Sequence, residues 1–413
     1  MSDTSEQARA VPAGSAEASA TLGDVARDAL QRMRGGDLGS WPVVIGLVLI
    51  CVIFEVLNPN FLSPDNLVNL TIQAAPLGVI AVGTVVVLLV AQIDLSVGSV
   101  SGVAGAIVGV GSMRLGWPMP ISIVVAIATG VAIGCLYGFL LTRFGVPSFI
   151  VTLAGLLAFL GLQLAILGPD GSINIPFSDP LVQFANTWFL PPWAVYVIVG
   201  IAGLGVLYGG LRTARRRARA NLPVPPLSVT VIKAVALVIL LSIGVWYLSL
   251  DRGTGAMPIL FLLLVVAVSY ALRRTRWGRS IYAVGGGIEA ARRAGVPVTR
   301  TLVTAFMICS AFAAIGGILA AARLGSATSV SESADTNLNA IAAAIIGGTS
   351  LFGGRGSAWS AVLGTLVISA ISSGLTLLNL DASARYMITG VVLVLAVIVD
   401  SLSRRSRVAH GQG

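Results

Sequence analysis

Residues able to carry catalysis or metal binding are scarce in this chain. The only histidine is His410 and the only lysine is Lys233. A histidine-based metal site, a histidine proton relay or a Ser-His-Asp triad within the apolar segments is therefore excluded. Because Lys233 lies between Ile232 and Ala234, the chain has no GxxxxGK[ST] phosphate-binding loop. We therefore predict a protein that is not an enzyme and has no cofactor of its own. Any ATP and Mg²⁺ would be bound by another chain.

Charged residues are also few, at 10% of the chain, whereas 56% of the residues are hydrophobic. This composition is far from that of a soluble globule and indicates a membrane protein. The three cysteines, Cys51, Cys135 and Cys309, all lie within apolar runs. Such placement favours small buried hydrophobic side chains over a disulfide or redox role.

Apolar runs of about 17 to 25 residues match the length of helix that crosses a bilayer. We predict an all-α, polytopic transmembrane helix bundle of about 10–12 spans. Glycine and polar residues interrupt the second, third and tenth spans, where broken or re-entrant helices are expected. The twelve predicted spans lie near 41–57, 66–91, 96–113, 119–142, 148–168, 193–211, 231–250, 257–272, 301–322, 337–352, 358–378 and 386–402.

The basic residues predict the orientation. With the N-terminus inside, 22 of the 26 Lys and Arg residues fall on the cytoplasmic side, and only Arg114, Arg252, Arg323 and Arg385 do not. This distribution satisfies the positive-inside rule and predicts a cell-membrane protein with both termini in the cytoplasm. The net charge of +9 is therefore explained by topology and gives no reason to expect nucleic-acid binding. Its arginine runs are expected to contact lipid headgroups.

The two ends differ from the central segment 41–404, which we predict to be the transmembrane domain. Residues 1–40 are rich in Ala, Ser, Gly, Glu and Asp and predict a largely disordered cytoplasmic tail. Within this tail, residues 21–34 have the apolar spacing of a short amphipathic helix. Residues 405–413 predict a second cytoplasmic tail.

Two polar, glycine-containing segments each separate two apolar runs rich in small residues. The first is 92–99, QIDLSVGS, and the second is 348–357, GTSLFGGRGS. Their similar context predicts two structurally related halves, as in many transporters.

Asp94 is the candidate functional residue of the first segment. A carboxylate in or near the hydrocarbon is costly and marks a functional position by default. Two interpretations remain open. Asp94 caps the following helix by accepting a hydrogen bond from a nearby backbone amide, or it lines the translocation path together with Ser96 and Ser99.

The loop 273–300 contains seven of the 26 basic residues and lies between two predicted spans. Its centre, residues 289–295 (EAARRAG), predicts a short helix. Glu289 at its start and Arg292 at its end suit the helix dipole and can pair at i,i+3. Gly295 stands where a left-handed terminating residue belongs. We predict a short cytoplasmic helix that another protein binds.

Four motifs in this order resemble the membrane subunits of bacterial sugar ABC importers, in the ribose/xylose/arabinose/galactose group. They are IDLSVGS at 93–99, VPSFIVTLAGLLAFLGLQL at 146–164, GRSIYAVGG with EAARRAG at 278–295, and AIIGGTSLFGGRGS at 344–357. The resemblance implies that Glu289, Ala290, Ala291, Arg292 and Gly295 couple this subunit to a separate ATPase. It also implies an extracytoplasmic sugar-binding protein, a second permease copy and a monosaccharide substrate.

The substrate is less well specified by the residues. An additional basic loop at 212–226 and an additional apolar span at 231–250 make the chain resemble xylose permeases more than ribose permeases. Branched-chain amino acids remain an alternative substrate class within the same superfamily. An ion-coupled secondary carrier is a second alternative, which would need no ATPase.

Overall fold

The computed structural model describes residues 41–220, 222, 224, 226–328 and 331–381, and only scattered positions after these. The described residues form fourteen helices and four strands of two or three residues each. The helices are α2 (Trp41–Leu57), α3 (Pro64–Leu89), α4 (Val97–Met113), α5 (Met119–Phe144), α6 (Ser148–Leu167), α7 (Pro180–Asn186), α8 (Pro192–Arg219), α9 (Leu227–Leu248), α10 (Ala256–Arg274), α11 (Arg276–Gly286), α12 (Ile288–Arg293), α13 (Val298–Leu324), α14 (Ser331–Ile346) and α15 (Ala358–Leu377). The strands are β1 (Ser172–Asn174), β2 (Phe189–Leu190), β3 (Thr254–Gly255) and β4 (Ser326–Thr328).

This architecture confirms the predicted polytopic helical bundle. Among the described residues, eight helices are long and apolar enough to cross a membrane: α3, α5, α6, α8, α9, α10, α13 and α15. Helices α2 and α4 each have 17 residues and α14 has 16, so they fall just below that length. Most of the predicted span at 386–402, and both predicted tails, lie outside the described residues.

The predicted interruption of the second span is absent, because α3 is one continuous helix of 26 residues. The Ser63 side chain accepts a hydrogen bond from the amide of Asn66 at its start, and Pro64 occupies the first turn, where its missing amide costs nothing. The third predicted span is likewise a continuous helix, α4, whereas the tenth, 337–352, runs past the end of α14 into the non-helical segment 347–357. Another non-helical segment, 90–96, follows α3.

The centre of the bundle is formed by α3, α13 and α15. In the most apolar 18-residue stretch of each helix, 89% of the residues of α3, 61% of α13 and 67% of α15 are buried within the protein, compared with 22% of α6. The first three therefore pack against protein, whereas α6 leaves most of its apolar surface for lipid. Such an all-round apolar helix is expected at the middle of a membrane bundle.

Helices α5 and α13 approach closely through glycines spaced four residues apart. A Cβ atom on Gly134 would lie 2.3 Å from the carbonyl oxygen of Phe306, and one on Gly138 would lie 2.6 Å from Cα of Val303. Only glycine fits at such separations, and small residues at this spacing let membrane helices meet backbone to backbone.

Helices α8 and α9 form a separate compact unit of residues 193–245, while the rest of the described chain forms the other unit. The helices pack on each other within their unit, where Gly203 faces the Val238 side chain. In the other unit, β2 pairs antiparallel with β3. The additional loop predicted at 212–226 comprises the end of α8 and the link after it, and the additional span predicted at 231–250 corresponds to α9.

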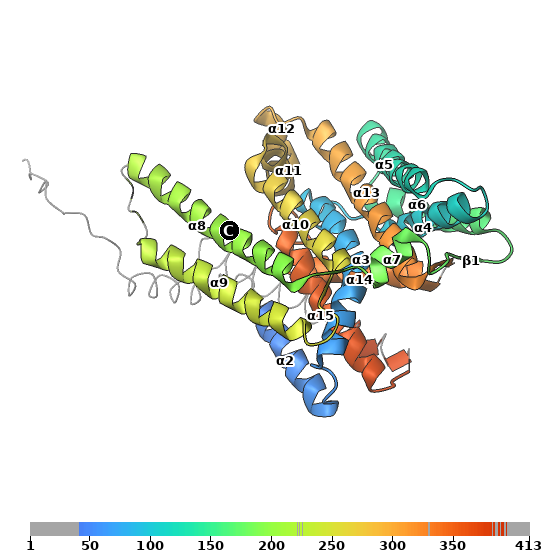
Figure 1. Cartoon of the computed structure of the whole chain (residues 1–413). Coiled ribbons are helices and arrows are strands. Elements are labelled where there is room, and N and C mark those ends of the chain that lie inside the picture. The colour runs from blue at the N-terminus through green and yellow to red at the C-terminus, as the bar shows by residue number, and fades with distance from the viewer. Residues whose placement is uncertain are drawn as a thin grey trace, which may run out of the picture. The chain divides into compact units, whose positions relative to one another are not determined.

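The remaining small sheet and the charged loop lie in the larger unit. Strand β1 pairs antiparallel with β4, joining the segment after α6 to the end of α13. Helices α11 and α12 lie together where α10 ends and α13 begins (Figure 1). The predicted helix at 289–295 is therefore α12, at the end of α13 remote from β4.

Candidate functional site

Asp94 lies in the non-helical segment between α3 and α4, with only 1% of its surface exposed. Its Oδ1 atom accepts hydrogen bonds from the backbone amide of Ser96 at 2.8 Å and from the Ser96 hydroxyl at 2.7 Å. Helix α4 begins at Val97 with Ser96 as its N-cap residue, so Asp94 bonds to the N-cap residue and not to an amide of the first helical turn. Its Oδ2 atom is buried and has no hydrogen-bond partner among the described residues. The thiol of Cys309 on α13, a weak donor, is a further side chain that interacts with this carboxylate.

Helices α5 and α6 hold this segment in place. The hydroxyl of Tyr137 on α5 donates a hydrogen bond to Oγ of Ser96 at 2.7 Å. On α6, Ser148 Oγ and Thr152 Oγ1 accept hydrogen bonds from the amides on either side of Asp94, at 3.3 and 3.1 Å. Buried amides outside a helix need such partners. These side chains therefore make it feasible for unwound backbone to lie inside the bundle.

Replacing Asp94 separates its two predicted roles. Asp94→Ala leaves the buried amide of Ser96 without its acceptor, at a cost of about 1–3 kcal/mol, and should lower the amount of folded protein in the membrane. Asp94→Asn keeps an acceptor oxygen and should be assembled normally, but should transport poorly if the charge serves the path. The measurements are membrane level and uptake, with Asp381→Asn, at an exposed position, as the control. Normal levels and normal uptake in both Asp94 variants would eliminate both roles.

The end of α3 also contacts the segment between α14 and α15, and α11 packs against both of them at this point. The carbonyl oxygen of Leu89 accepts a hydrogen bond from the amide of Gly354 at 3.0 Å. A Cβ atom on Gly285 of α11 would lie 1.7 Å from the Leu89 oxygen and 2.6 Å from the Gly354 nitrogen. Only glycine permits this approach. The end of α3 therefore meets the polar segment 348–357, and we call Leu89, Gly285 and Gly354 the glycine junction.

Helix α12 ends in a well-formed termination motif. The amide of Gly295 donates to the carbonyl of Arg292, and the amide of Val296 donates to that of Ala291, both at 3.0 Å. Gly295 has φ of +76°, in the left-handed region. This pair of bonds with a left-handed glycine is the Schellman motif. The local sequence thus ends α12 after two turns.

The outer face of α12 is free for a partner. Ala291 is 4% exposed and packs into the core, whereas Glu289, Ala290 and Arg292 are exposed. Glu289 and Arg292 form an ion pair of 2.8 Å with both side chains more than 60% exposed. An exposed pair of this kind adds little stability. One side of α12 therefore anchors the helix, and the other presents charged groups outward.

Helix α11 connects α12 to the bundle. The indole nitrogen of Trp277 donates a hydrogen bond to Oγ1 of Thr304 on α13, and the hydroxyl of Tyr282 donates one to the carbonyl of Gly356, both at 2.9 Å. Burial raises the pKa of Tyr282, an effect that the charge of Arg273 partly opposes. The phenol therefore stays protonated and remains a donor at neutral pH. A displacement of α12 would reach α13 and the 347–357 segment through these contacts.

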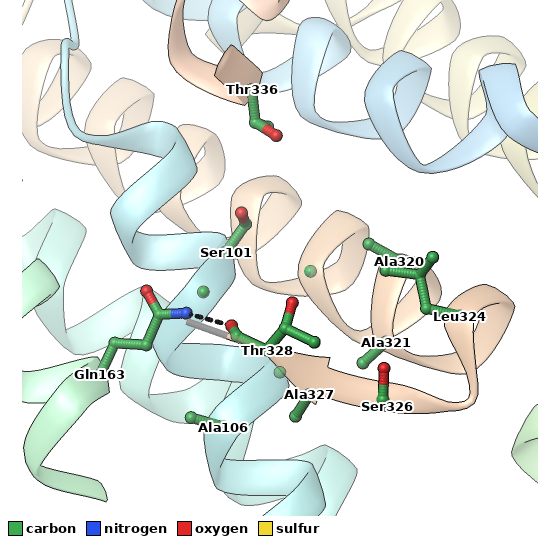
Figure 2. A pocket seen from close by; sticks show the side chains of 13 residues that line it. Ser101, Ala106, Gln163, Ala320, Ala321, Leu324, Ser326, Ala327, Thr328 and Thr336 are labelled. Carbon is green, nitrogen blue, oxygen red and sulfur yellow. Dashed lines mark hydrogen bonds between the residues drawn. The ribbon is translucent and has the colours of Figure 1, made fainter. Parts of the chain in front are cut away.

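A cavity of about 50 Å³ lies further from α12, between α4, α6, α13, β4 and α14 (Figure 2). Its lining contains glycines and alanines of α4 and α13 together with five residues that have polar side chains. Gln163 is buried and donates a hydrogen bond from Nε2 to the carbonyl of Thr328 at 2.7 Å. None of the lining residues is charged. The five polar lining residues are Ser101, Gln163, Ser326, Thr328 and Thr336.

Reasoning from the sequence identified some of these residues and missed others. It singled out Asp94, Ser96 and Ser99, which are all buried just before α4 or in its first turn. It did not assign a role to Ser148 or Thr152, because their partners lie more than fifty residues away along the chain. The motif at 146–164 contained both residues and was the only available signal.

The structure and the following similarities define a multi-pass membrane protein of the permease class. Residues 66–397 match the family described as branched-chain amino acid transport system / permease component, and the chain belongs to this family. It is 36% identical to the xylose transport system permease protein of Escherichia coli (strain K12) over 366 residues, covering 88% of this chain and 92% of that protein.

Two further relatives cover similar shares. The xylose transport system permease protein of Haemophilus influenzae (strain ATCC 51907 / DSM 11121 / KW20 / Rd) is 34% identical over 376 residues, covering 91% of this chain and 99% of that protein. The ribose import permease protein of Bacillus subtilis (strain 168) is 31% identical over 357 residues, covering 86% and 91%. No solved structure matches this chain.

Proposed function

We propose that this chain is the membrane subunit of an ATP-binding-cassette importer that carries a monosaccharide, xylose or a related sugar, into the cytoplasm. The observation that carries the proposal is the similarity to xylose permeases across 88% to 91% of the chain. The exposed, well-terminated α12 supports an ATPase partner, since a short rigid helix can transmit a movement between two packed states. ATP and Mg²⁺ are bound by that partner, because this chain lacks a phosphate-binding loop.

The assembly contains two copies of this permease, the ATPase on the α12 side and a sugar-binding protein on the opposite side. Residues 169–192, which include β1, α7 and β2, contain no basic residue and form part of the docking face for the binding protein. The binding protein supplies most of the affinity, so the permease needs only a transient polar path.

The α12 side is cytoplasmic in this proposal, with both termini on the same side. The support is the placement of 22 of the 26 Lys and Arg residues. A reporter fused after Arg404 should therefore report the cytoplasm and one inserted near Ser178 the outside. The reverse result at either position would refute the orientation.

Branched-chain amino acids are the second candidate substrate, because the matched family carries that description. The complex purified through a tag on this chain and reconstituted into vesicles distinguishes the candidates. We expect ATP-dependent uptake of labelled xylose or ribose when the loaded binding protein is present, and no uptake of leucine. Uptake of leucine alone would replace the substrate class. Uptake that an ionophore abolishes without loss of ATP would instead establish an ion-coupled carrier.

A further inference from the structure

The cavity between α4, α6, α13, β4 and α14 offers the chemistry that recognises a neutral sugar. Hydroxyl groups of Ser101, Ser326 and Thr336 and the side-chain amide of Gln163 line it. These groups both donate and accept hydrogen bonds, as sugar hydroxyls do. A zwitterionic amino acid would need charged or strongly polarised partners for its two ends, and the lining residues carry no charge. The lining therefore suits an uncharged polyhydroxylated solute.

A buried amide side chain is costly in a membrane bundle unless it is hydrogen-bonded. Gln163 has such a bond to the carbonyl of Thr328, and polar residues at membrane depth mark substrate paths. Gln163 is 1% exposed, and its helix otherwise contributes mainly apolar residues to the surface. A Cβ atom on Gly102 would lie 2.2 Å from Oε1 of Gln163, so a larger residue at this facing position on α4 would displace the amide group. The close fit of these two positions places an amide group at the cavity wall (Figure 2).

The cavity begins at the level where the close backbone packing of α4 against α13 ends. A Cβ atom on Gly317 of α13 would lie 2.0 Å from the carbonyl oxygen of Ser101, which leaves no space between the helices at that level. One turn further along α4, a Cβ atom on Gly105 would lie 3.5 Å from the Gly317 oxygen and 3.6 Å from Cβ of Ala321. These are ordinary contacts, and they leave Gly105 at the edge of open space.

The described state is closed to the sugar. A water molecule needs about 10–15 Å³ of such space, so the cavity of about 50 Å³ holds a few waters and is too small for a monosaccharide. Passage of a sugar therefore requires α4 and α13 to separate.

Resting on the proposed sugar-import function, we infer that this cavity is a constriction on the sugar path, where sugar hydroxyls exchange hydrogen bonds with Ser101, Gln163 and Thr336. It lies beyond the backbone contact of Ser101 with Gly317, on the side remote from α12. The sugar reaches it before the glycine junction and leaves it when α4 moves away from α13.

Filling the cavity through Gly105 tests the inference in the reconstituted complex. Gly105→Ala adds only the Cβ atom that the site accommodates and should keep uptake close to that of the wild type. Gly105→Leu extends into the cavity and should lower uptake by roughly tenfold or more, as overpacking of a confined space predicts. Gly161→Leu on α6 is the matched control, because Gly161 is exposed with no atom within 4 Å of its Cβ position. Uptake by Gly105→Leu equal to that by Gly161→Leu would overturn the inference.

A second variant covers the case in which Gly105→Leu does not assemble. Gly105→Cys is small, and a methylthio-transferring reagent enlarges its side chain after assembly. Modification should stop uptake in this variant and leave the wild type, which has only Cys51, Cys135 and Cys309, largely active. Modification confirmed by mass without loss of uptake, or no modification during turnover, would refute the inference. If the wild-type complex itself transports no sugar, the proposed function fails, whatever the variants do.

Discussion

Replacing Gly295 by valine is expected to abolish ATP-dependent uptake while the chain still enters the membrane. Gly295 ends α12 with φ of +76°, and no atom lies within 4 Å of the position a Cβ would occupy. The penalty is therefore conformational: a left-handed backbone costs an L-residue about 1–2 kcal/mol, and a β-branched residue more. The last turn of α12 can relieve this strain by unwinding, which would misplace the helix. The measurements are uptake and stimulation of the partner ATPase by the loaded binding protein.

Gly295→Asn is the matched control, since asparagine tolerates the left-handed conformation best among the non-glycine residues. It should retain most of the uptake that Gly295→Val loses. A companion variant, Glu289→Lys, puts positive charge at the positive end of the α12 dipole and removes the ion pair with Arg292. It should weaken coupling without affecting insertion. Wild-type ATPase association and stimulation in both Gly295→Val and Glu289→Lys would rule out α12 as the coupling element.

Adding one methyl group at Gly285 is expected to destabilise the whole complex. The new Cβ would lie 1.7 Å from the carbonyl oxygen of Leu89, so α11 must shift or the hydrogen bond from Gly354 to Leu89 must break. Overpacking combined with a lost buried hydrogen bond costs about 2–4 kcal/mol or more. Gly285→Ala should therefore lower the melting temperature of the purified complex and reduce uptake.

The neighbouring glycine provides the control for this change. Gly286 is exposed, and a Cβ at its position would meet no atom within 4 Å. Gly286→Ala makes the same chemical change in the last turn of the same helix and should leave stability nearly unchanged. Equal melting temperatures for the two variants would show that the glycine junction does not limit the packing of α11.

The positions of most spans were predictable because they depend on local composition. The runs at 119–142 and 148–168 correspond to α5 and α6 within two residues at each end. The second span was predicted to be interrupted because small and polar residues break its hydropathy. The structure instead contains a continuous α3. This helix packs against α13 and α15 and not against lipid, so its small and polar residues need not interrupt it.

The candidate site was only partly predictable, and the reason is distance along the chain. A hydrogen bond between Asp94 and the amide of Ser96 joins near neighbours, so a local hydrogen bond of this carboxylate could be inferred from the sequence. The bond from Tyr137 to Ser96 and the contact of Gln163 with Thr328 each join residues on separate elements. No periodicity or spacing in one sequence indicates such pairs.

By itself, the sequence determined that this protein crosses the membrane repeatedly and that a short helix ends at Gly295. Each property follows from the length of an apolar run or from the backbone conformation that a residue type prefers. Both can be recognised from neighbouring residues in the sequence. Only the tertiary structure decided that the end of α3 and the segment 347–357 meet beside α11, and that α4 and α13 part to leave a polar cavity. These features depend on how closely backbones far apart in the chain approach, and packing of the whole bundle sets that distance.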